Sequence, residues 1–209
     1  MRRAVFAHSP RDPLLSCPVD RGTRVFWALI VVLLSASAFF GYNAQTRRAA
    51  LKPTQELVSG DVVTVTSVVD GDTVVVKSDG GSRTTVRLVG IKTFDATQKF
   101  DNAARFGALA IDSLRRLTEN QPVRLVLAEP PRDRHGRTLA HLYVGEVDVA
   151  LELVKAGLAL TYPVYPFPGL PIYAEEQAHA HGDRRGLWAD PAVAKRAELL
   201  ELQWRKERQ

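Results

Sequence analysis

VVTVTSVVDGDTVVVKS, at residues 62–78, indicates the class of fold. It is dense in β-branched residues, which favour strands, and Asp70-Gly71-Asp72 interrupts it where a tight turn can form. Asp79-Gly80-Gly81 then leads into a second β-branched stretch, RTTVRLVGI at residues 83–91. Together the two stretches predict a set of strands joined by tight turns.

The segments that follow predict further strands and several short helices. Apolar residues recur at helical spacing on one face of residues 106–117, while Arg115 and Arg116 occupy the other face. The other predicted elements are strands at 123–127 and 139–144 and helices at 148–156 and 173–181. Gly157 follows one of these helices in the position of a left-handed C-cap. A β-rich first half with about three packed helices indicates an α+β, mainly β domain: a small Greek-key barrel of the oligonucleotide-binding (OB-fold) type.

The C-terminal residues 190–209 predict one more helix. Asp190 suits its N-cap and Pro191 its first turn. Four apolar residues can either dock this helix onto the domain or bind a protein partner: Leu199, Leu200, Leu202 and Trp204.

The formal net charge of +5 is weak support for a nucleic-acid substrate, because the positive excess lies outside the predicted domain. Residues 1–60 contain 8 Lys and Arg against 3 Asp and Glu, whereas residues 61–189 contain 15 against 16. The excess lies beside an apolar segment, so a membrane role explains it more simply. The single cysteine, Cys17, excludes an internal disulfide framework and a zinc site built from several cysteines.

That apolar segment is VFWALIVVLLSASAFFGY at residues 25–42, which contains no charged residue. Its length is close to the roughly 20 residues of a transmembrane helix. Five arginines precede it and three basic residues follow, so the positive-inside rule predicts residues 1–24 as a cytoplasmic basic tail. The domain would then lie outside, in a periplasmic or extracellular position, at the end of a polar linker at residues 43–60.

Two alternatives to a transmembrane anchor remain open for this segment. The first is a signal peptide, because its small residues at 35–38 suit cleavage, which would give a secreted protein. The second is a buried helix of a soluble domain.

Three charged clusters stand out from the predicted strands. Asp70 and Asp72 flank a glycine, which by itself is also typical of a hairpin turn. Arg87 lies on an apolar strand and needs an anionic partner if it points inward, whereas an outward arginine needs none. The third cluster is Asp133-Arg134-His135-Gly136-Arg137, which alone resembles a solvated turn.

The order of these motifs resembles the staphylococcal nuclease, or thermonuclease, family. The motifs are DGDT at 70–73, RLVGI-x-T at 87–93, DRHGR at 133–137, and GLA at 157–159 with RRGLW at 184–188. Each short motif is weak alone, but they occur in the family's order and spacing over about residues 61–189. The resemblance implies a five-stranded barrel with packed helices and a calcium-dependent nuclease that cuts DNA and RNA.

The resemblance also implies roles for individual residues. Asp72 matches a metal-binding aspartate, and Thr93 matches the threonine whose carbonyl touches the metal. Arg87 and Arg137 match the two arginines that bind the substrate phosphate.

Further matches concern residues around this set. Asp70 and Asp133 match supporting acids. Either Tyr162 or Tyr165 matches a tyrosine that contacts the substrate. His135 stands where the family has an aromatic residue, so it either fills that space or acts as an acid or base near neutral pH.

Three positions depart from the family pattern. Lys92 replaces the second metal-binding aspartate, Asp95 replaces the glutamate that positions the attacking water, and Leu109 replaces a helix glutamate. Calcium prefers six to eight oxygen ligands, so an ammonium group at Lys92 should weaken its binding strongly. Three outcomes are open. Lys92 could turn away and leave a weaker metal site, or its ammonium could supply part of the positive charge that the metal provides. Catalysis could also be lost while binding is kept.

The sequence thus predicts a membrane-anchored phosphodiesterase of nuclease type that acts on nucleic acid or another phosphodiester. Arg87 and Arg137 would hold the phosphate, Asp72 would place a cation and Asp95 would position water. The cofactor would be Ca²⁺ or another divalent cation, or none. The alternative is a non-catalytic module of the same fold that binds a phosphorylated ligand or a protein partner.

Overall fold

The computed structural model describes residues 57–133 and 135–207, together with residues 22, 26–27, 29–35 and 37. The chain divides into two compact units, Met1–Lys52 and Pro53–Gln209. In the first unit all described residues are helical, and the rings of Phe26 and Trp27 meet edge to face at 6.0 Å.

Among the described residues, no helix combines the length and the hydrophobicity needed to cross a bilayer. The predicted anchor at 25–42 extends beyond those residues, and most of the basic tail at 1–24 and of the linker at 43–60 lies outside them. The anchor and the signal peptide therefore both stay predictions.

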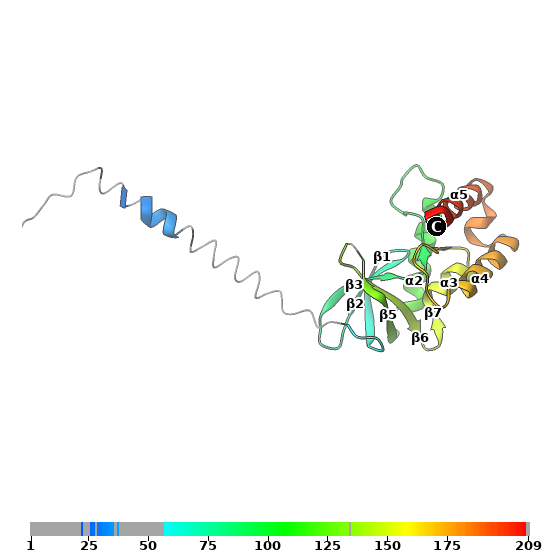
Figure 1. Ribbon diagram of the computed structural model, residues 1–209, viewed down its shortest axis with the longest axis horizontal. Helices are drawn as coiled ribbons and strands as arrows, with labels where there is room; N and C mark the ends of the chain where they lie inside the picture. Colours follow the sequence, from blue (N-terminus) through cyan, green and yellow to red (C-terminus); the bar gives the residue numbers. More distant parts are fainter. Residues whose placement is uncertain are drawn as a thin grey trace, which may run out of the picture. The chain divides into compact units, whose positions relative to one another are not determined.

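The second unit is built on a closed, five-stranded mixed barrel (Figure 1). Its strands are β1 (Val62–Asp70), β2 (Thr73–Lys77), β3 (Arg83–Leu88), β5 (Val123–Arg132) and β6 (Thr138–Val144). They are hydrogen-bonded in the order β3-β2-β1-β5-β6, and a parallel pairing between β3 and β6 closes the barrel. The prediction of a five-stranded barrel is confirmed.

Three short strands complete the sheets. β7 (Val147–Asp148) pairs with β6 at the edge of the barrel sheet. β4 (Ile91–Lys92) pairs with β8 (Leu160–Thr161) in a separate two-stranded sheet.

The alternation of apolar side chains along the strands fills the barrel. Val74, Val76 and Val86 are fully buried, because every second residue of a strand faces the same side. Burying such side chains is the main favourable term in folding. The β-branched stretches that open the domain therefore supply much of its core.

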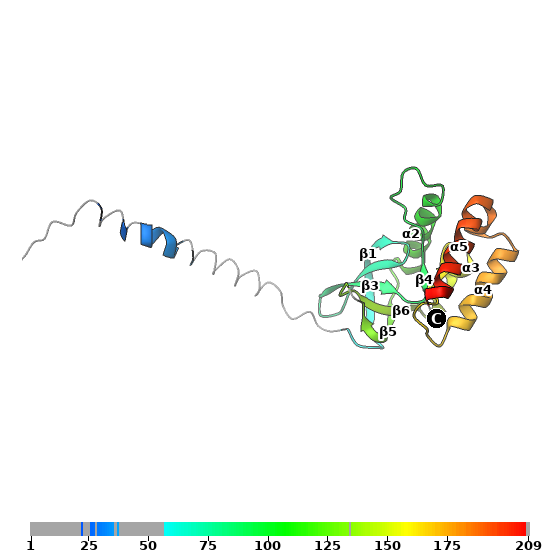
Figure 2. The ribbon, with the colours of Figure 1, turned by 45° about the horizontal axis from the view of Figure 1, so that its top comes forward.

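The helices are α2 (Ala104–Thr118), α3 (Val149–Lys155), α4 (Leu170–Gly182), the short 3₁₀ helix η1 (Gly186–Ala189) and α5 (Pro191–Glu207). The first, second and third of these match the three helices predicted within the domain. The expected number of packed helices was too low, because η1 and α5 also pack against it. Figure 2 shows α3, α4 and α5 gathered on one side of the barrel.

The C-terminal helix α5 packs through its apolar face. Val193, Ala197 and Trp204 are buried, and they share a second hydrophobic cluster with Phe94 and Trp188. Leu199 and Leu202, by contrast, are more than half exposed. Trp204 thus docks the helix onto the domain, which was one of the two predicted roles of its apolar residues.

Two glycines explain why GLA and RRGLW belong to one pattern. Gly157 and Gly186 both have positive φ, at 66° and 55°. Their backbones touch, since Leu187 N donates to Gly157 O at 2.8 Å and a Cβ on Gly157 would collide with Arg185 O. Only glycine permits both this backbone conformation and this close approach.

Candidate active site

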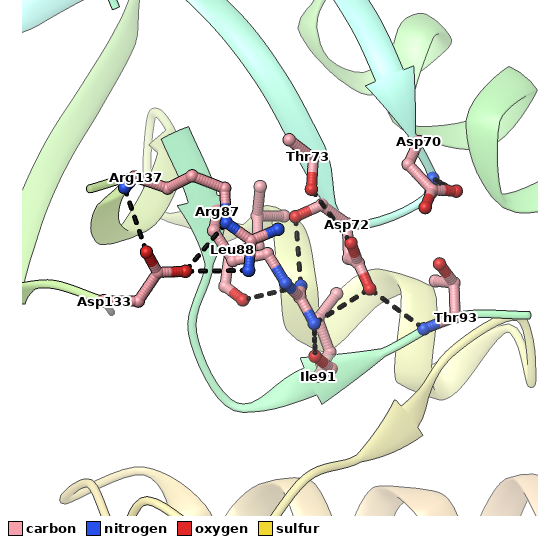
Figure 3. A network of polar contacts seen from close by, with 10 residues as sticks. Asp70, Asp72, Thr73, Arg87, Leu88, Ile91, Thr93, Asp133 and Arg137 are labelled. Atoms are coloured by element: carbon pink, nitrogen blue, oxygen red, sulfur yellow. Dashed lines mark hydrogen bonds and ion pairs between the residues drawn. The ribbon is translucent and has the colours of Figure 1, made fainter. Parts of the chain in front are cut away.

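An ion pair between Arg87 and Asp72 lies at the centre of the site (Figure 3). Asp72 belongs to the turn between β1 and β2, and Arg87 lies near the end of β3. The antiparallel register pairs Thr73 with Arg87, which brings Asp72 beside the arginine. Arg87 Nη2 lies 2.9 Å from Asp72 Oδ2, and the two side chains are only 14% and 8% exposed.

Backbone carbonyls satisfy the other terminal N–H groups of Arg87. Its Nη1 donates to Asp72 O and Leu88 O at 3.1 Å each, and its Nη2 donates to Ile91 O at 2.8 Å. Burial lowers the pKa of Arg87, and the charge of Asp72 opposes that effect. A guanidinium nevertheless stays protonated in proteins. Arg87 is therefore an inward arginine with the anionic partner that its apolar strand required.

Asp72 is also held from its other side. Thr73 Oγ1 donates to Asp72 Oδ1 and Thr93 N donates to Asp72 Oδ2, both at 3.1 Å. Thr93 in turn packs over Gly71, where a Cβ would lie 2.8 Å from Thr93 Oγ1. The glycine between the two aspartates thus makes room for Thr93 beside Asp72.

Asp70 lies on the far side of Asp72 from Arg87 (Figure 3). Burial raises the pKa of its carboxyl, a hydrogen bond from Gly71 N lowers it, and the charges of Asp72 and Asp95 raise it. Asp72 and Asp95 therefore both lie within electrostatic range of Asp70.

A second guanidinium lies on the same wall of the barrel. The parallel register pairs Arg87 with Leu139, so the loop that precedes β6 runs beside Arg87. Arg137 in that loop forms a two-pronged ion pair with Asp133, whose Oδ2 accepts from Nε and Nη2 at 2.7 Å each. The charge of Arg137 contributes to lowering the pKa of Arg87, which places the two within electrostatic range.

Asp133 also shapes its own loop. Its Oδ1 accepts from the backbone N of His135 at 2.9 Å and of Arg137 at 3.0 Å. Burial alone would raise the pKa of this carboxyl, but the hydrogen bonds from Arg137 and His135 outweigh it and the pKa is lowered. The His135 side chain is exposed on this loop.

Asp95 is exposed in the loop after β4. Its Oδ1 accepts from Thr97 N and Thr97 Oγ1 at 2.7 Å each, and its Oδ2 accepts from Gln98 Nε2 at 3.0 Å. Hydrogen bonds from Gln98 and then Thr97 lower the pKa of Asp95. The carboxylate is ionised at neutral pH, and it organises its own loop.

Lys92 points toward aromatic rings. Ile91 is buried and Lys92 is exposed, as expected for neighbours on opposite faces of β4. Lys92 Nζ lies 5.7 Å from the ring centroid of Tyr162 and 5.9 Å from that of Trp204. Both distances fall within the range of cation–π attraction. The sequence did not predict that Trp204 reaches Lys92, because the two residues are far apart along the chain.

The two candidate tyrosines lie next to each other. The ring centroids of Tyr162 and Tyr165 are 6.1 Å apart, and Tyr165 is 66% exposed. Tyr162 contributes to the electrostatics of Arg87, so it borders the ion pair. Leu109 is partly exposed on α2 and brings no charge to the site.

The donors around Asp72 do not make a ready calcium site. Within the described part of the chain, no three carboxylate, imidazole or thiol side chains converge closely enough to hold a metal ion. Thr93 Oγ1 is a buried oxygen without a hydrogen-bond partner there, and the Asp72 carboxylate, which already accepts from Thr73, Thr93 and Arg87, keeps about one of its four acceptor positions for a cation. These oxygens are fewer than the six to eight that calcium prefers.

Comparisons with known proteins identify the family of the chain. Residues 85–190 match the family described as staphylococcal nuclease homologue. A thermonuclease of Staphylococcus hyicus is 31% identical over 175 residues, which are 82% of this chain and 98% of that protein. A thermonuclease of Staphylococcus intermedius is 34% identical over 132 residues, 63% and 78% of the two chains. An uncharacterized endonuclease of Haemophilus influenzae is 34% identical over 143 residues, 66% and 75%.

Proposed function

This chain belongs to the staphylococcal nuclease family, and from that premise we propose that Arg87, Asp72 and Arg137 form the phosphate-binding part of its active site. The chain is a phosphodiester hydrolase that acts on nucleic acid. The observation that carries the proposal is the meeting of two guanidinium groups, from β3 and from the loop before β6, beside one buried carboxylate.

Hydrolysis of a phosphodiester requires a placed water, neutralisation of the charge that grows on the phosphoryl oxygens, and help for the leaving oxygen. Arg137 uses Nε and Nη2 for Asp133, which leaves Nη1 for a phosphate oxygen. Arg87 has contacts at both terminal nitrogens, so an arriving phosphate binds its Nε–H or exchanges with Asp72 or with a carbonyl. Two guanidinium groups then share the charge of the transition state.

We assign Asp95 to the attacking water. It is an ionised, exposed carboxylate on a loop that its own hydrogen bonds hold in shape. A carboxylate has about four acceptor positions, so its contacts with Thr97 and Gln98 leave room for a water.

We propose that the dependence of hydrolysis on a divalent cation is weakened in this chain. The oxygen donors do not fit a calcium site, and the chain carries Lys92 where the family pattern has an aspartate. The aromatic rings of Tyr162 and Trp204 hold the Lys92 ammonium by cation–π contacts. This arrangement supports the first predicted outcome, in which Lys92 turns aside and a weaker cation site remains.

The test is hydrolysis of single-stranded DNA in calcium, magnesium and manganese and in a chelator. We expect Arg87→Ala to lower kcat/KM by about a hundredfold or more, as the loss of one transition-state donor does elsewhere. Arg83→Ala, on the same strand, is the matched control and should retain activity. Unchanged activity in Arg87→Ala would remove the proposal.

Lys92→Asp tests the cation separately. It adds a carboxylate at the position where the family pattern has one, so we expect calcium to bind more tightly and to stimulate hydrolysis at lower concentration. Lys92→Met removes the charge without adding a ligand, and calorimetric titration with calcium compares the three proteins. Equal calcium affinity in all three would contradict the assignment of the weak site to Lys92.

We also propose that residues 25–42 anchor the domain to a membrane, with the N-terminus inside and the domain in a periplasmic or extracellular position. The support is the uncharged apolar segment and the larger number of arginines that precede it. Membrane fractionation and protease digestion of intact cells test both points. A domain released in mature form would favour the cleaved signal peptide.

A further inference from the structure

Phe100 is the most exposed large apolar side chain among the described residues, with a relative exposure of 103%. It lies in the loop between β4 and α2, which projects from the body of the domain (green in Figures 1 and 2). Scattered apolar side chains on a surface are ordinary, but a wholly exposed phenyl ring contributes nothing to the stability of its own fold. Whether the ring can bind a ligand therefore depends on the residues around it.

The loop that carries Phe100 is braced at both ends. Near its start, Asp95 binds Thr97 and Gln98, and at its end Asp101 accepts from Ala103 N at 2.9 Å. Arg196 of α5 connects the two ends, because its guanidinium pairs with Asp101 and also lies 5.1 Å from the ring centroid of the buried Phe94. Phe100 is thus an exposed ring on a supported loop.

A pocket of about 350 Å³ opens beside Phe100, between this loop and the first turns of α5. Its lining residues include Phe100, Asn102, and Asp101, which is paired with Arg196. The volume is near the lower end of the range for small-ligand pockets, about 300 to 1,000 Å³. The ion pair leaves the lining close to neutral, which suits an uncharged planar group better than a phosphate.

The position of this pocket relates it to the candidate active site. Phe100 lies five residues after Asp95, on the same loop, and Asp95 is within electrostatic range of Asp70. Lys99 precedes Phe100 and is exposed, so its ammonium can approach the phosphates of a bound nucleic-acid strand. Proteins that hold single-stranded nucleic acid combine positive charge for phosphates with aromatic rings for bases.

We infer that Phe100 and the adjoining pocket form a nucleobase subsite, in which a base of the single-stranded substrate stacks on the phenyl ring. The inference rests on the proposed function. The Asn102 amide and the Arg196 guanidinium offer hydrogen-bond donors and an acceptor to the base edge. The subsite selects unpaired strands, because a base within a duplex is not free to leave its stack.

Binding without turnover tests the inference. The full chain is titrated with two fluorescent oligonucleotides of equal length and phosphorothioate backbone, one of thymidine and one abasic. Phe100→Ala should weaken binding of the thymidine strand by about tenfold or more, the loss expected for one base–aromatic stack, and leave the abasic strand unchanged. Phe100→Trp should retain or strengthen binding of the thymidine strand.

Ile172→Ala is the matched control, since Ile172 is an exposed apolar residue on α4. It should change neither affinity, and both variants should unfold at the temperature of the parent chain. Equal binding of the thymidine strand by the parent and Phe100→Ala would overturn the inference and leave Phe100 to a protein or membrane contact. An equal loss for both strands would also overturn it, because the ring would then act on the backbone. If the parent chain bound neither strand, the proposed function itself would fail.

Discussion

At the scale of single residues, Arg87 both stabilises the site and belongs to the proposed phosphate-binding group. It neutralises the buried Asp72 and donates hydrogen bonds to the carbonyls of Leu88 and Ile91. Removing one partner of a buried pair leaves a charge without compensation, which commonly costs about 3 to 5 kcal/mol. Loss of activity in an Arg87 variant must therefore be judged together with its stability.

Asp70 should oppose folding at neutral pH. Its pKa in the folded protein is raised, mainly by burial, so the protonated carboxyl is favoured by folding and the charged form is disfavoured. The stabilising contribution is complete below the unfolded pKa of about 3.8 and is lost as the pH rises through the folded pKa. Asp70→Asn should thus stabilise the domain at pH 7, by roughly 0.5 kcal/mol after allowance for solvent screening.

Urea unfolding at pH 7 and at pH 3 measures this effect. The difference between Asp70→Asn and the parent should vanish at the lower pH, where the carboxyl is protonated in both states. Asp79→Asn, at an exposed turn, is the control and should show little change at neutral pH. A constant difference at both pH values would contradict the electrostatic origin.

At the scale of elements, one carboxylate joins α3 and α4. Asp148 caps the N-terminus of α3 by accepting from Ala150 N and Leu151 N. The hydroxyl of the buried Tyr173 on α4 lies 2.9 Å from both oxygens of the same carboxylate. Burial and the charge of Asp148 raise the pKa of Tyr173, so its hydroxyl stays a donor.

Asp148→Ala should destabilise the domain by about 2 to 4 kcal/mol. The loss of an N-cap costs about 1 kcal/mol, and a buried hydroxyl left without a partner costs about 1 to 3 kcal/mol more. Because Tyr173→Phe removes that hydroxyl, the double variant should lose less than the sum of the two single variants. Chemical denaturation of the four proteins gives the coupling free energy, and strict additivity would show that the two side chains act independently.

At the scale of the whole second unit, the barrel and the helices contribute two hydrophobic clusters. One cluster fills the barrel, and the other joins Phe94, Trp188 and the buried face of α5. Trp204 belongs to the second cluster and also faces Lys92. The C-terminal helix is thereby linked to the position that departs from the family pattern.

Trp204→Ala should lower the free energy of unfolding by about 3 to 5 kcal/mol, as is typical when a buried tryptophan is truncated. It should also release the Lys92 ammonium from one of its two rings and so change the calcium dependence of hydrolysis. Leu202→Ala, on the exposed face of the same helix, should change stability by less than about 0.5 kcal/mol. Similar losses in both variants, measured by urea unfolding, would contradict the packing of α5 through Trp204.

The barrel strands and the helices packed around them follow from local signals in the sequence. β-branched runs and helical periodicity are local signals, so Val62–Asp70 and Ala104–Thr118 were predicted close to their observed bounds. The candidate acids and arginines were also predictable, because their motifs keep a fixed order along the chain. The residues that lie near them in the folded domain were not predictable in this way.

Which of these groups lie close together depends on the packing of the folded domain. The parallel closure of β3 on β6 brings Arg137 toward Arg87, and the docking of α5 places Trp204 against Lys92. These contacts depend on strand register and helix packing between segments distant in the sequence. No local pattern encodes such a contact, because its free energy arises only when the barrel has closed.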